Sequence, residues 1–159
     1  MYRDHPAVHS VIIVPGHGVG PAVVGRSTAE KVLAQLGSDC QVSRYDRAEE
    51  VFQISYDYAG DGDYRPDRPA QATRPATMTF RFGLLESIVI GVYQKGLATE
   101  EGIRIGTPRA EVLRVLGPPT RVLAGDGVDT LRYLDRGIEL DVSGERDVVT
   151  NVTVFRPRG

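Results

Sequence analysis

Two stretches of the chain share one pattern of hydrophobic and polar positions, and both predict a short helix. Residues 27–37 read STAEKVLAQLG and residues 107–117 read TPRAEVLRVLG, with apolar residues at the spacing of one helical face. Ser27 and Thr107 are the expected N-caps, and the glycine that closes each stretch is expected to end its helix. Two copies of one signature, roughly 80 residues apart, predict a tandem duplication.

Alternation of apolar and polar residues predicts β-strands after each helix. In the first half it occurs in VFQISYDY at 51–58, in Met78, Phe80 and Phe82 between polar neighbours, and along 87–93. The remaining expected strands are 11–14, 41–45, 130–134, 137–142 and 148–155.

Each half is therefore expected to be a helix followed by antiparallel strands. Residues 11–95 form the first expected repeat and residues 96–156 the second, and together they make one compact unit. A long insertion at 59–76, dense in Gly, Pro, Asp and Arg, interrupts the first repeat. The predicted fold class is α+β: one continuous antiparallel sheet with both helices on one face and the opposite face open.

The helical signature followed by a small meander resembles the repeat of the β-lactamase-inhibitor-protein (BLIP) fold. It also resembles the SmpA/OmlA (BamE) outer-membrane lipoproteins. Residues 103–155 match this pattern well and residues 23–93 match it loosely, and the tandem arrangement is similar to that of BLIP-like proteins. The resemblance implies a non-catalytic binder that clasps a partner in a concave sheet, of inhibitor or immunity type, or an assembly accessory. The chain departs from both groups in its cysteines, because Cys40 is its only one.

The open sheet face is the first candidate binding surface. Aromatic and Arg side chains on an otherwise polar platform are typical anchors of protein interfaces. The predicted partner-binding residues on this face are Gln53, Arg81, Val89, Tyr93, Arg132, Leu134 and Phe155. A second patch is expected in the insertion, at Tyr64, Arg65 and Arg68. Ordinary solvent exposure and, for the insertion, disorder explain the same compositions, and these alternatives stay open.

Charge and hydropathy indicate which kinds of partner and which cellular compartment to expect. The formal net charge of −2 over 159 residues gives no general attraction to nucleic acid or to anionic membranes. The chain has no apolar run of membrane length and does not begin with a signal-peptide pattern. We therefore expect no membrane insertion, and a cytoplasmic protein or an exported one whose leader is absent from this sequence.

Two other kinds of site are weaker predictions. A strand leading into the glycine-rich turn at 16–20 is how a dinucleotide site begins, because glycine amides can approach a pyrophosphate. The turn lacks the third glycine and the βαβ alternation of such sites, so a tight turn is favoured. His5, His9 and His17 have no carboxylate or thiol at ligand spacing, and no metal is expected.

The sequence thus predicts a non-catalytic protein-binding module with an unidentified protein partner and no cofactor. Two alternatives stay open. One is a self-associating building block that buries the same face in a homodimer. The other is a small nucleotide-binding or enzymatic domain that uses residues 16–20.

Overall fold

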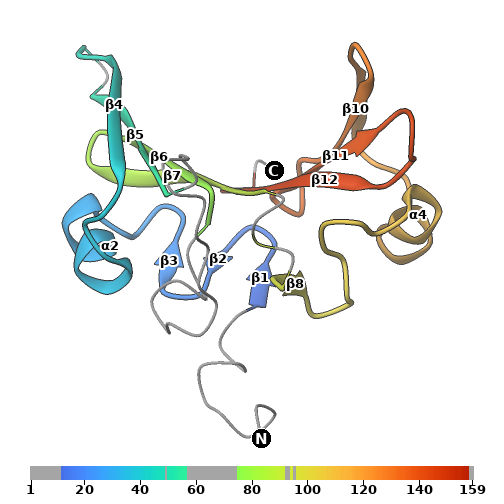
Figure 1. Ribbon diagram of the computed structural model, residues 1–159, viewed down its shortest axis with the longest axis horizontal. Coiled ribbons are helices and arrows are strands. Elements are labelled where there is room, and N and C mark those ends of the chain that lie inside the picture. Colours follow the sequence, from blue (N-terminus) through green and yellow to red (C-terminus); the bar gives the residue numbers. More distant parts are fainter. Residues whose placement is uncertain (1–11, 49, 57–74, 92–93, 95, 158–159) are drawn as a thin grey trace, which may run out of the picture.

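The computed structural model describes residues 12–48, 50–56, 75–91, 94 and 96–157 (Figure 1). These residues form an α+β fold with helices α2 (Ala29–Leu36) and α4 (Arg109–Leu116), as the two helical stretches predict. The larger sheet is antiparallel, with eight strands in the order β4-β5-β6-β7-β12-β11-β10-β9. Its strands are β4 (Gln41–Asp46), β5 (Val51–Ser55), β6 (Thr77–Arg81), β7 (Leu84–Ile90), β9 (Arg121–Ala124), β10 (Val128–Tyr133), β11 (Ile138–Ser143) and β12 (Val149–Phe155).

A second, four-stranded sheet shows that the prediction of one continuous sheet is wrong. Its order is β3-β2-β1-β8, and β1 pairs in parallel with β8. The strands are β1 (Ile12–Val14), β2 (Gly18–Val19), β3 (Ala22–Val23) and β8 (Ala98–Thr99). Strands of two or three residues are too short to show an alternating pattern, so the sequence did not reveal this sheet.

The elements are arranged in two layers (Figure 1). Helix α2, the four-stranded sheet and helix α4 lie on one face of the eight-stranded sheet, which bends away from the helices near β4 and near β10. One hydrophobic cluster lies between the layers. Its fully buried members come from every layer and include Ile13, Val19, Val32, Val112, Met78, Phe80, Ile88, Leu140 and Val154. This packing supports the two helices, since eight residues are too few to form a stable helix in isolation.

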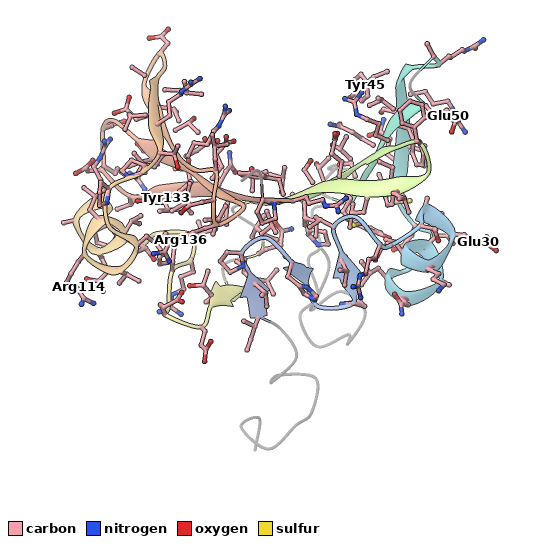
Figure 2. All side chains as sticks on the ribbon, turned by 180° about the vertical axis from the view of Figure 1, so that it is seen from behind. Glu30, Tyr45, Glu50, Arg114, Tyr133 and Arg136 are labelled. Atoms are coloured by element: carbon pink, nitrogen blue, oxygen red, sulfur yellow. The ribbon has the colours of Figure 1, made fainter. Side chains whose placement is uncertain are left out.

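Each helix ends against a tyrosine of its own sheet half. Tyr56 Oη donates a hydrogen bond to Gly37 O at 2.7 Å, and Tyr133 Oη donates to Gly117 O at 2.8 Å. Both glycines have positive φ, as predicted for residues that end a helix. Burial raises the pKa of the Tyr133 phenol, and the smaller effect of Arg136 opposes it, so the phenol stays a donor at neutral pH. Figure 2 shows Tyr133 between the sheet and α4.

The predicted N-caps are one residue too early. The observed caps are Thr28 and Pro108, and only Thr28 accepts a side-chain hydrogen bond from the helix. The hydroxyls of Ser27 and Thr107 instead accept hydrogen bonds from the backbone amides of Val23 and Arg104, which precede them in the chain. Their carbonyls accept from backbone amides at the start of β7 and β12. These bonds hold both residues against the sheet, so each helix starts one residue later.

The two halves of the larger sheet meet at β7 and β12 about a local twofold axis. The β6–β7 pairing and the β11–β12 pairing each contain a β-bulge. Val89 is paired with Thr153, and each of the two residues lies the same number of positions after the bulge in its own strand. The flanking pairs follow the same symmetry: Ile88 with Val154 and Ile90 with Val152. The repeat boundaries at 11–95 and 96–156 stay a prediction.

Phe82 differs from the predicted strand pattern. The alternation places it in line with Met78 and Phe80, which are fully buried, but β6 ends at Arg81 and Phe82 is 61% exposed. Phe82 and Gly83 form the turn between β6 and β7, with φ of 52° and 81°. A two-residue hairpin turn in which both central residues have positive φ matches the twist of the flanking strands. The geometry of the hairpin therefore overrides the apolar alternation.

Candidate functional site

A groove of about 630 Å³ lies on the eight-stranded sheet, near the β6–β7 turn and the end of β12. Most of its strand residues are on the face opposite the helices, because they alternate with buried ones such as Tyr133, Leu140 and Val154. The buried Leu85 and Gly25, which precedes α2, complete its inner side. The first half contributes Arg81, Leu84, Glu86 and Ser87, and the second half contributes Arg132, Leu134, Glu139 and Phe155. The groove therefore exists only where the two halves are joined.

Two Arg–Glu pairs position charge in the groove. Arg132 Nε donates to Glu139 Oε1 at 2.6 Å, between residues directly opposite each other on β10 and β11. Arg81 Nε donates to Glu86 Oε1 at 3.0 Å, from β6 to the bulge of β7. All four side chains are partly exposed, and such pairs contribute little to stability. Their main effect is to hold charged groups in fixed places.

Apolar side chains lie between and beside these pairs. Phe155 is on β12, which separates β7 from β11 in the sheet order, so its ring lies between the two charged pairs. Phe155 and Leu134 are both half-buried. The exposed side chain of Arg156 follows at the rim and forms no ion pair within the described part of the chain. The site thus combines a half-buried aromatic ring with a border of fixed and free charges.

The other end of the same face has different chemistry. The local twofold axis relates Arg132 and Glu139 to Ser55 and Thr77, which are paired in the same register. It likewise relates Phe155 to Gly91. The two ends of this face are structurally equivalent, but of the two only the end with the groove has the charged pair and the aromatic ring.

Cross-strand hydrogen bonds order other polar residues on this face. Gln53 Nε2 donates to Thr79 Oγ1 at 3.2 Å in the first half. In the second half, Asp141 accepts from Thr130 Oγ1 at 2.8 Å and from Asn151 Nδ2 at 3.3 Å. These side chains bond to one another, so they frame the groove without adding unsatisfied polar groups to it.

The predicted binding residues fall into three groups. The structure brings four of them into the groove: Arg81, Arg132, Leu134 and Phe155. Gln53 and Val89 lie on the same face outside the groove lining. Tyr64, Arg65, Arg68 and Tyr93 lie outside the described residues. Whether any of these residues contacts a partner stays a prediction.

Sequence reasoning missed Glu86 and Leu84 as groove residues. The β-bulge after Thr79 leaves Glu86 as an extra residue on β7, so strict alternation assigns it to the wrong face. The dipeptide Phe82-Gly83 was the available signal, because recognising a turn there would have started β7 at Leu84.

The glycine-rich turn at 16–20 has a packing explanation. Gly16 N donates to Gly137 O at 3.1 Å, and a Cβ at Gly16 would approach Arg136 O to 2.8 Å. A Cβ at Gly18 would come within 1.9 Å of Ala22 O. The glycines thus allow close backbone contacts, and the Gly16 amide is already hydrogen-bonded, which favours the interpretation as a tight turn.

The described residues contain neither a cluster of metal-ligating side chains nor a membrane-spanning helix. No group of three or more His, Cys, Asp or Glu side chains there is arranged to hold a metal ion. Within the same residues, no helix has the length and apolar character needed to cross a membrane.

Comparisons with known proteins inform the fold. No family model and no curated protein matches the chain. The crystal structure of the uncharacterised protein YfeY from Escherichia coli is similar, with a TM-score of 0.58 and 15% identity, covering 90% of this chain and 99% of YfeY. A DUF4309 family protein, YjgB from Bacillus subtilis, aligns with a TM-score of 0.42 and 17% identity over 94% of this chain and 90% of YjgB. The likeness to YfeY shows a shared fold and gives no information on function.

Proposed function

We propose that the protein is a non-catalytic protein-binding module that contacts its partner through the groove on the eight-stranded sheet. The observation that supports this most is Phe155 between two fixed Arg–Glu pairs, on a face that no described helix or strand covers. Aromatic residues and Arg are enriched in protein interfaces and dominate their binding energy. The fixed charges add electrostatic complementarity, which selects among partners.

The composition of the groove favours binding over catalysis. Its described lining contains neither His nor Cys, and both of its carboxylates accept hydrogen bonds from Arg. A general acid or base must be free to exchange a proton with the substrate, whereas both of these carboxylates are already held by Arg. The resemblance of the helical repeat to BLIP and BamE proteins supports a binder of inhibitor, immunity or assembly-accessory type.

Site-specific photocrosslinking tests the proposal. Leu134, which is half-buried in the groove, is replaced by p-benzoylphenylalanine, and Leu113 on the outer side of α4 is replaced in a matched control. Each variant is irradiated in lysate of the source organism. We expect an adduct of one defined protein from position 134 that position 113 does not form and that Phe155→Ala strongly reduces.

Two outcomes contradict the proposal. Equal adducts from positions 113 and 134 would show that capture does not depend on the groove. An adduct at roughly twice the 17.3 kDa mass of the chain, also formed by the purified protein, would support the homodimer instead.

A further inference from the structure

We infer that the β6–β7 turn, with Phe82 at its tip, is a second contact element of this binding site. Together with the groove it fits an extended partner segment that has an Asp or Glu next to a bulky apolar side chain. This inference rests on the proposed function, and it concerns the residues that select the partner.

The conformation of Phe82 is unfavourable for folding. It has φ of 52°, a region that bulky L-residues rarely adopt, and its turn type prefers Asn, Asp or Gly at this position. Because Phe82 is 61% exposed, burial of the ring does not offset this conformational cost. An aromatic residue that is strained and mostly exposed gains little from burial, and strain of this kind concentrates at functional sites.

The position of Phe82 links it to the groove. It lies between Arg81 and the exposed Leu84, and both of these residues line the groove. A Cβ added at Gly83 would meet no described atom within 4 Å, so the turn projects freely. Leu84 therefore continues the apolar lining that Phe155 begins, and Phe82 lies next to it in the turn at the end of the strands.

The equivalent turn in the second half supports a specific role for Phe82. The turn between β11 and β12 contains the exposed polar residues Glu145, Arg146 and Asp147. This turn is longer than the two-residue turn at Phe82, and its exposed tip is polar. Of these two described turns, the one with the apolar tip is the one beside the groove.

Charge in the groove indicates the second feature of the partner. The two internal pairs neutralise Arg81 and Arg132, whereas Arg156 forms no ion pair with the described residues and is exposed. The lining thus has one excess positive charge beside its apolar side chains. A carboxylate that binds Arg156, next to an apolar side chain against Phe155, Leu84 and Phe82, complements both features.

A displayed library of random 12-residue peptides, selected on the intact chain, tests this inference. We expect enriched peptides to have Asp or Glu within about three positions of a Leu, Ile, Phe, Met or Trp. Affinity of one such peptide is then measured by fluorescence anisotropy. Phe82→Asn is expected to weaken binding about tenfold while raising Tm, because Asn suits the turn better. Arg156→Ala is expected to weaken it similarly, and Glu145→Ala in the equivalent turn to leave it unchanged.

Each alternative result has a defined meaning. A lower Tm for Phe82→Asn would show that the ring is packed in the folded chain and would overturn the inference. Wild-type affinity of Phe82→Asn, with Phe155→Ala losing affinity, would overturn the inference but leave the proposed function standing. Wild-type affinity of both variants would contradict both. Enriched peptides without the acidic and apolar pair, or no enriched peptide at all, would exclude this partner class.

Discussion

In the first half of the molecule, Phe52 stacks on Phe80 with ring centroids 5.1 Å apart and an interplanar angle of 9°. When the two halves are aligned on their β-bulges, Asp129 is equivalent to Phe52 and Val142 is equivalent to Phe80. There Arg109 at the start of α4 donates to Asp129 at 2.9 Å and to Asp147 at 2.7 Å. The hydrogen bond to Asp129, followed by that to Asp147, raises the pKa of Arg109, so it stays charged throughout the accessible pH range.

The contacts that do not differ show what the architecture requires. Both halves keep the tyrosine hydrogen bond to the helix end, the same bulge and the same backbone bonds before the helix. The side chains between helix and strands differ: the first half has an aromatic stack and the second half has a network of ion pairs. Both can lie beside the core, because the charged groups of the network are paired and hydrogen-bonded. The first half should therefore depend more on apolar burial, and the second half should be more sensitive to salt.

The largest expected effect is in the first half. Phe80→Ala should lower the free energy of unfolding by about 3–5 kcal/mol, because it removes a fully buried ring and its stack on Phe52. The matched variant Val142→Ala should cost about 2 kcal/mol, since a smaller buried side chain is lost. Urea unfolding monitored by circular dichroism measures both. Equal losses would contradict the different reliance on apolar burial.

A smaller effect is expected from the shared tyrosine contact. Tyr133→Phe should cost about 1 kcal/mol, because Gly117 O loses its donor at a part-buried position. Tyr56→Phe should cost the same or less, since Tyr56 is less buried. The same unfolding experiment tests both variants. If neither changed stability, the tyrosine bonds would not be part of the common architecture.

The smallest expected effect is electrostatic and confined to the second half. Arg109→Ala should cost about 1 kcal/mol or less in low salt, because its pairs with Asp129 and Asp147 are partly exposed. The loss should shrink in 1 M NaCl, where the Debye length is about 3 Å. Arg114→Ala, which breaks an exposed pair with Glu111 on the outer side of α4, is the control and should cause no measurable change (Figure 2). A salt-independent loss for Arg109→Ala would indicate packing instead.

Local signals in the sequence determined the elements. The apolar stripe and closing glycine predict each helix, since helical period and C-capping depend on residues within one or two turns. Alternation predicts most strands of the larger sheet, because side chains on opposite faces meet core and solvent. These signals also indicate the repeated plan and place Arg132 and Phe155 on the face opposite the helices.

Only the tertiary structure decided how the halves meet and where the groove lies. The pairing of β7 with β12 brings Glu86 and Phe155 onto neighbouring strands, and parallel pairing of β1 with β8 creates the second sheet. Neither pairing has a local signal, because both join segments far apart in the chain. The bulge that exposes Glu86 and the turn that exposes Phe82 depend on strand register, which packing of the whole core selects.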